Sequence, residues 1–164
     1  MEDLLVTVQL LSSRETRNVS TLEKLKSPNK MKWNTDIKTL STPKQRKIIL
    51  EIMYWCIEEL GMSPRLKSFP DLKLINKADT GLYGEYLSGA HKVLIYPDEQ
   101  ENLRRLVDTV IHEFTHSCQR FISVRYYAAS EKHGYNNNPF EVEARKVARE
   151  NRTACLKHLQ KVFG

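Results

Sequence analysis

The chain has 164 residues, of which 40% are hydrophobic and 28% charged, so it can form one domain with an ordinary hydrophobic core. No apolar run approaches the roughly 20 residues that cross a bilayer. The acidic pair Glu2 and Asp3 precedes a short apolar stretch, which is not the pattern of a signal peptide. We therefore expect a cytoplasmic protein without a membrane partner.

The net charge of +6 is concentrated in the first third of the chain. Residues 14–47 contain ten lysines or arginines against three acids, a balance of +7. Such a window can attract nucleic acid or an acidic partner, although it is more often a solvated flank. Binding of nucleic acid or an acidic partner through this window is therefore a secondary expectation.

The pattern of the chain changes at residue 42. Residues 1–41 show no clear periodicity and are expected to be an N-terminal extension of uncertain structure, while residues 42–164 are expected to form the folded domain. Thr42 as N-cap with Pro43 at the first helical position is typical of a helix start, and Gly61 of a helix end. The residues between them are apolar around much of the helix, which predicts a central core helix.

Three short segments, residues 72–75, 81–87 and 92–96, have strand-like composition and are separated by turn residues. The last two indicate a hairpin, so we expect a small antiparallel sheet. A long amphipathic helix follows from residue 98, with an apolar stripe that continues to Ile122. Helices packed with such a sheet give an α+β fold, and an exposed sheet edge could bind an extended peptide.

The long helix carries the sequence His-Glu-Phe-Thr-His, in which His112 and His116 are four residues apart. Residues at this spacing share one helix face, and here that face lies opposite the apolar stripe, so both imidazoles can point at one ion. Zinc binds imidazole nitrogen and keeps one position open for water in catalytic sites. Glu113 can take a proton from that water. The alternative is a solvated polar face; Thr109 and Gln119 share it and are candidates to orient the histidines.

A catalytic zinc usually has three protein ligands, and Glu141 is our choice for the third. A polar, aromatic loop is expected over residues 126–138, followed by a final helix that runs to about Leu159. On that helix Glu141 faces the apolar side, whereas Glu143 is turned away from it. Residues 138–141 also fit a helix N-terminal capping pattern, so capping is the alternative role for Glu141.

The motif His112-Glu113-Phe-Thr-His116, followed by Glu-Val-Glu-Ala from residue 141, resembles the gluzincin metallopeptidases. Their pattern is H-E-x-x-H and then E-x-x-A on the next helix. The resemblance covers about residues 80–160 and implies a zincin-like fold of helices against a small sheet. It implies His112, His116 and Glu141 as the zinc ligands and Glu113 as the general base.

A second, weaker resemblance involves His133 and the glycine after it. This pair sits where SprT-like peptidases, which act on DNA-bound proteins, carry a third histidine followed by glycine. The segment that begins at Glu141 fits the gluzincin pattern better. If Glu141 is the ligand, His133 or Tyr135 could instead donate a hydrogen bond to the developing oxyanion. Taken alone, each of the two is more simply interpreted as a loop residue.

We therefore expect a zinc-dependent peptidase that hydrolyses a peptide or protein substrate by metal-activated water, with Glu113 as general base. Two alternatives remain. One is a SprT-like, DNA-associated protease, and the other is a non-catalytic structural or interaction module that retains the peptidase fold.

Overall fold

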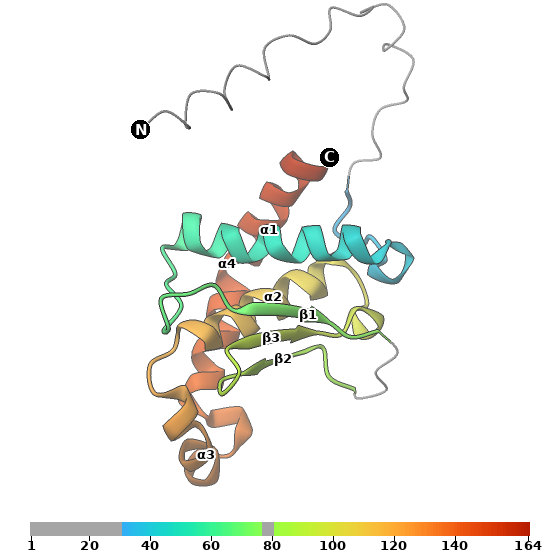
Figure 1. The fold of residues 1–164 in the computed structure, drawn as a ribbon. Coiled ribbons are helices and arrows are strands. Elements are labelled where there is room, and N and C mark those ends of the chain that lie inside the picture. The colour runs from blue at the N-terminus through green and yellow to red at the C-terminus, as the bar shows by residue number, and fades with distance from the viewer. Residues whose placement is uncertain (1–30, 77–80) are drawn as a thin grey trace, which may run out of the picture.

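The computed structural model describes residues 31–76 and 81–164, which form an α+β fold of four α-helices and a three-stranded mixed sheet (Figure 1). Helix α2 lies at the centre, in contact with α1, with α4 and with strands β2 and β3. No helix in the described part of the chain is long and apolar enough to cross a bilayer. The elements are η2 (Ile37–Thr39), α1 (Thr42–Leu60), β1 (Asp71–Leu74), β2 (Gly84–Leu87), β3 (Lys92–Ile95), η3 (Pro97–Glu99), α2 (Leu103–Cys118), α3 (Ile122–His133), η4 (Tyr135–Asn137) and α4 (Pro139–Phe163).

The sheet has the strand order β1-β3-β2. Strands β2 and β3 form the antiparallel hairpin that the sequence predicts, with Tyr86 opposite Val93. The expectation of a purely antiparallel sheet was wrong, because β1 pairs with β3 in parallel, with Leu72 opposite Val93. Strand β3 lies between the other two, so β1 and β2 are the two edge strands.

Helix α1 has the predicted bounds and buries Ile48, Ile49 and Ile52 completely. Its N-cap is Ser41 rather than the expected Thr42. The helix ends at Gly61, whose φ of 62° places it in the left-handed region that glycine adopts at little cost. Together with α2 and α4 this helix encloses the hydrophobic core.

The packed body begins before residue 42, where we expected the domain to start. Met31 and Ile37 belong to the core, and the exposed fraction of Ile37 is 0%. The backbone carbonyls of Trp33 and Thr35 accept hydrogen bonds from the first turn of α2. Residues 31–41 are therefore part of the domain, whereas half of the basic window, residues 14–30, lies outside the described residues.

The predicted long helix is broken between α2 and α3. We expected one helix to continue to Ile122, but α2 ends at Cys118, and Gln119 has extended backbone angles. Phe121 then has a φ of 63°, in the left-handed region, and a new helix begins at Ile122. The expected loop over residues 126–138 is consequently wrong, because most of it is the helix α3.

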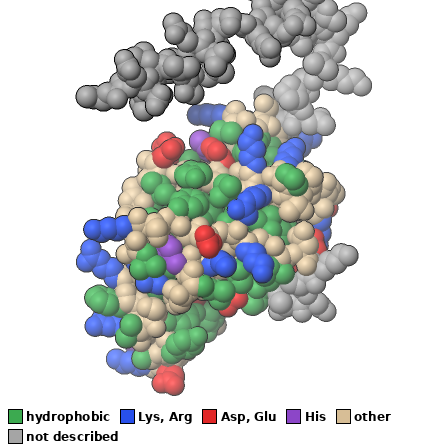
Figure 2. All heavy atoms as spheres, in the orientation of Figure 1, with side chains coloured by type: hydrophobic (Ala, Val, Ile, Leu, Met, Phe, Trp, Pro, Cys, Tyr) green, Lys and Arg blue, Asp and Glu red, His purple; other side chains and the backbone are tan. Residues whose placement is uncertain are grey.

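Basic side chains are spread over the face drawn in Figure 2, where they alternate with apolar and neutral ones. The basic side chains on this face are thus dispersed and do not gather into one continuous patch (Figure 2).

The packing of residues 31–41 leads to a stability prediction. Ile37→Ala should lower the free energy of unfolding by about 2–5 kcal/mol, because it leaves a cavity in the core. Trp33→Ala removes a larger side chain that is 40% exposed, and should cost much less. Urea denaturation of the two variants measures the difference. Equal stability of Ile37→Ala and the wild type would show that residues 31–41 are not part of the domain.

Candidate metal centre

Three side chains from two helices converge on one point. His112 and His116 lie one turn apart on α2, on the face opposite the core, and Glu141 lies in the first turn of α4. The two Nε2 atoms are 3.1 Å apart. Glu141 Oε2 lies 3.3 Å from His112 Nε2, and Glu141 Oε1 lies 3.3 Å from His116 Nε2. These three residues could hold a metal ion.

The spacing of these atoms fits a four-coordinate ion. Zinc bonds of about 2.0–2.2 Å in tetrahedral geometry place the ligand atoms about 3.3–3.6 Å apart. The observed separations of 3.1–3.3 Å are close to this range. In addition, Glu141 Oε2 is buried without a hydrogen-bond partner among the described residues. A buried oxygen of this kind is normally satisfied, and a cation at the centre would satisfy it.

Glu141 faces the histidines and does not cap its own helix. Asn138 is the N-cap of α4, and its side chain accepts a hydrogen bond from the backbone N–H of Phe140. The exposed fraction of Glu141 is 3%. Burial alone would raise the pKa of this carboxyl, but the neighbouring imidazoles of His112 and His116 and the hydroxyl of Tyr126 hold the pKa far below its ordinary value. The carboxylate is therefore charged and available as a ligand.

Gln119 orients the second histidine. Its Oε1 lies 2.7 Å from His116 Nδ1, and its Nε2 donates to the carbonyl of Phe140 at 2.8 Å. A hydrogen bond from Nδ1 to this amide oxygen leaves the Nε2 lone pair of His116 free to bind a metal ion at the centre. The other expected support, Thr109, donates instead to Gln100 Oε1 at 3.2 Å and does not hold a histidine.

Tyr126 is a site residue that the sequence patterns missed. Its hydroxyl donates to Glu141 Oε1 at 2.6 Å. Burial and this carboxylate raise the pKa of the phenol well above its ordinary value, so it stays protonated and remains a donor. Because residues 126–138 were expected to form a loop, Tyr126 was not assigned to a helix face. The available signal was the four-residue spacing from Ile122, because these two residues share the inner face of α3.

Glu113 lies beside the centre and outside the ligand group. The exposed fraction of the residue is 8%, and burial raises the pKa of its carboxyl, which the nearby histidines partly oppose. Strand β2 passes close to it, because a Cβ built on Gly84 would lie 2.9 Å from Glu113 Cγ and 2.8 Å from Thr109 Cγ2. Only glycine leaves room for the strand to cover this part of α2.

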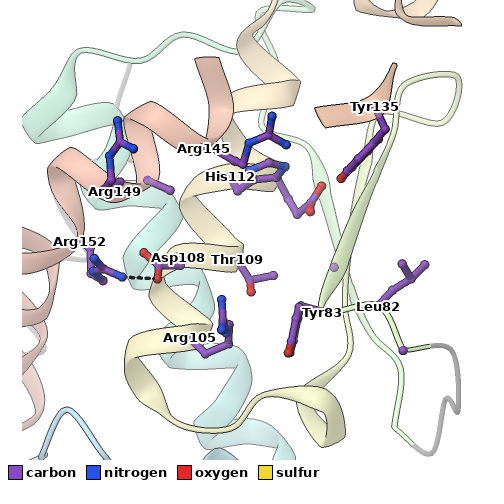
Figure 3. A pocket seen from close by; sticks show the side chains of 14 residues that line it. Leu82, Tyr83, Arg105, Asp108, Thr109, His112, Tyr135, Arg145, Arg149 and Arg152 are labelled. Atoms are coloured by element: carbon purple, nitrogen blue, oxygen red, sulfur yellow. Dashed lines mark hydrogen bonds and ion pairs between the residues drawn. The ribbon is translucent and has the colours of Figure 1, made fainter. Parts of the chain in front are cut away.

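A cleft crosses the centre in two lobes. The arginine lobe, of about 480 Å³, lies between α2, α4 and the segment before β2, and is drawn in Figure 3. The aromatic lobe, of about 270 Å³, lies toward α3 and is lined by Tyr86, Tyr126 and Tyr127 among others. His112, Glu113 and Tyr135 line both lobes. The predicted residue Tyr135 therefore belongs to the site.

His133 is not brought to the centre. It occupies the last residue of α3, is exposed, and lines neither lobe of the cleft. The candidate ligand group therefore consists of His112, His116 and Glu141. Glu113 and Tyr135 lie beside this group, and His133 lies away from it.

Comparisons with protein-family models, with curated proteins and with solved structures found no match to this chain. Two nitrogen ligands, one oxygen ligand, a buried carboxylate and a cleft on either side can hold a metal and admit an extended molecule.

The ligand set predicts metal content. Glu141→Ala should lose the metal, because two imidazoles remain of the three ligands, whereas His133→Ala should keep it. Elemental analysis of metal per chain, on protein purified with added zinc, checks both. Thermal denaturation shows whether each variant is folded. Metal loss in folded His133→Ala, or full metal content in folded Glu141→Ala, would contradict the assignment.

Proposed function

We propose that the protein is a zinc-dependent peptidase of the gluzincin type with a zincin-like fold. The observation that carries this proposal is the convergence of two imidazoles from α2 and one carboxylate from α4, with ligand atoms within 4.8 Å of one another, beside a buried glutamate in an open cleft. A histidine pair with one carboxylate is a donor set that catalytic zinc uses.

The choice of zinc follows from the donors. Borderline nitrogen ligands with a single carboxylate suit zinc better than magnesium or calcium, which prefer oxygen ligands only. Bound there, zinc would supply a Lewis acid for the scissile carbonyl and lower the pKa of a water molecule to about 7.

Glu113 has the properties of the general base. Burial raises the pKa of its carboxyl, which brings its basicity nearer to that required at neutral pH. It lines both lobes, so a water molecule at the centre of the cleft is within its reach. Glu113 takes the proton of the attacking water and then passes it to the leaving amine.

Tyr135 is the candidate donor to the developing oxyanion. It reaches the junction of the two lobes from η4, across from His112 (Figure 3). Burial and the charge of Glu141 raise the pKa of Tyr135 to about 12, so its hydroxyl is protonated at neutral pH. A protonated phenol can donate a hydrogen bond to a negatively charged oxygen.

Strand β2 is the feature that suits a peptide substrate. It is one of the two edge strands of the sheet, and its residues Gly84, Glu85 and Tyr86 line the cleft. An extended peptide can add to such an edge through backbone hydrogen bonds. This arrangement would place the peptide backbone beside Glu113.

The SprT-like alternative is less well supported, because it requires His133 as the third ligand and His133 is exposed outside the cleft. Residues 14–30, which carry much of the basic window behind that alternative, lie outside the described residues. A non-catalytic module is the remaining competitor, and an activity measurement separates it from the peptidase.

The role of Glu113 predicts a loss of turnover without a loss of metal. Glu113→Gln should reduce hydrolysis of a labelled, unfolded protein by about 10²- to 10⁴-fold, because the water proton has no acceptor. Glu150→Gln changes an exposed acid on α4 by the same chemistry and should leave the rate unchanged. Undiminished hydrolysis in Glu113→Gln would show that Glu113 is not the general base. No hydrolysis by the zinc-loaded wild type would favour the non-catalytic module.

The role of Tyr135 predicts a separate effect. Tyr135→Phe should lower kcat by about 10²- to 10³-fold with little change in KM, because the lost hydrogen bond forms only in the transition state. Tyr54→Phe, at a half-exposed position on α1, serves as the control. A Tyr135→Phe variant with normal kcat would exclude the residue as the donor.

A further inference from the structure

We propose that the arginine lobe binds carboxylate groups of the substrate, so that the protein selects peptides that are acidic on the C-terminal side of the scissile bond. This inference rests on the proposed peptidase function and names its substrate class. Four arginines and two acids line the lobe, a local balance of +2: Arg105, Arg145, Arg149 and Arg152 with Asp108 and Glu113.

Three of the arginines form a row along α4. Arg145, Arg149 and Arg152 are four and three residues apart, so they share one helix face, and Figure 3 shows them along one side of the lobe. Like charges at this spacing destabilise a helix by a few tenths of a kcal/mol per pair. The row therefore needs compensating negative charge.

Two members of the row have such compensation. Arg152 Nη1 lies 2.7 Å from Asp108 Oδ2, and Arg145 Nη1 lies 3.6 Å from Glu141 Oε2. Arg149, between them, is exposed and has no ion pair or hydrogen bond among the described residues. A ligand carboxylate would complete the pattern, since a guanidinium can bind a carboxylate through two hydrogen bonds.

Arg105 faces this row from α2. Its guanidinium lies 4.9 Å from the centre of the Tyr83 ring, which holds the head group at the edge of the lobe. Its ion pair with Glu101 is long, at 3.9 Å, and exposed. Arg105 therefore contributes a second cation that a carboxylate can approach.

The direction of the substrate follows from the edge strand. Gly81 and Tyr83, which precede β2, line only the arginine lobe, whereas Glu85, Tyr86 and Ser88 line only the aromatic lobe. Antiparallel strand pairs are the commoner and slightly more stable kind. A peptide antiparallel to β2 runs from the aromatic lobe into the arginine lobe, so the residues after the scissile bond meet the arginines.

The reach of the row limits where the acid lies. Arg149 is two helical turns beyond Glu141, about 12 Å along α4. An extended peptide covers that distance in about four residues. The selected carboxylate is therefore within about four residues after the scissile bond, either as a Glu or Asp side chain or as a free C-terminus.

The ligand is a carboxylate on a peptide, and not the backbone of a nucleic acid. The lobe continues the edge of β2, which recognises peptide backbone. Asp108 and Glu113 also offset half of the four arginine charges, which leaves a field suited to one or two negative groups. A polyphosphate backbone would need a continuous positive surface.

The test measures binding in the full chain with Glu113→Gln, which prevents turnover. Fluorescein-labelled peptides of twelve residues share an aromatic first half and carry either three Glu or three Gln in the second half, each as a C-terminal acid and as an amide. The acidic peptides should bind about 10-fold or more tightly than the neutral amide, as expected for charge-assisted hydrogen bonds. A Glu-dependent gain identifies side chains as the source, and a gain from the free acid alone identifies the C-terminus.

Arg149→Glu, added to the same background, should abolish this preference. Lys146→Glu makes the same charge change at an exposed position on α4 that does not line the lobe, and should retain the preference. Circular dichroism confirms that both variants are folded. Equal binding of all four peptides to the parent, or equal loss in the two charge reversals, would overturn the proposal. Tighter, Arg149-dependent binding of a single-stranded oligonucleotide would also overturn it.

A second measurement separates this proposal from the peptidase function. The zinc-loaded wild type is incubated with a mixture of peptides, and mass spectrometry maps the cleavage sites. Cleavage with acids enriched in the four positions after the scissile bond supports both proposals. Cleavage without that enrichment overturns the carboxylate preference and leaves the peptidase. Carboxylate-dependent binding without any cleavage overturns the peptidase and leaves the arginine lobe as a binding site.

Discussion

The site depends on one buried negative charge. A buried carboxylate is costly unless it is compensated, and polar or charged side chains from three helices surround Glu141. The histidines of α2 approach it at 3.3 Å, Tyr126 of α3 donates to it at 2.6 Å, and Arg145 of α4 lies 3.6 Å away. The relative positions of these helices are thus fixed at the point where a metal would bind, and the same contacts that organise the fold prepare the ligand geometry.

Helix α2 serves the core and the site with opposite faces. One face buries Leu106, Val110 and Phe114 completely, and the other presents the histidines. The polar face is covered by β2 on one side and by α3 and α4 on the other, so His116 is 5% exposed instead of solvated. Gly84 makes this cover possible, because any larger residue would push the strand away from the helix. The candidate chemistry therefore takes place in a partly dry environment, where charges interact more strongly than in water.

The sequence predicted those features that depend on local pattern. The bounds of α1, the β2–β3 hairpin, the apolar stripe of α2 and the inward position of Glu141 all follow from periodicity, capping and turn residues. The parallel pairing of β1 with β3 did not, because register between distant strands is decided by tertiary packing. The break after Cys118 was also missed, since no glycine or proline marks it. It is stabilised by Gln119, which bonds to His116 and to the carbonyl of Phe140, contacts that exist only in the folded chain. Missing that break placed Tyr126 in an expected loop, whereas His133 was a candidate because of the SprT-like resemblance.

The two walls of the cleft differ in how firmly they are anchored. The arginine lobe is enclosed by α2 and α4, both of which contribute large buried side chains to the core. Helix α3, which forms the outer wall of the aromatic lobe, has Ile122 as its one buried residue. Elements with so few buried contacts open locally at a free energy well below that of global unfolding. One half of the cleft is therefore a fixed template, whereas the other can adjust its width to side chains of different size while the core stays intact.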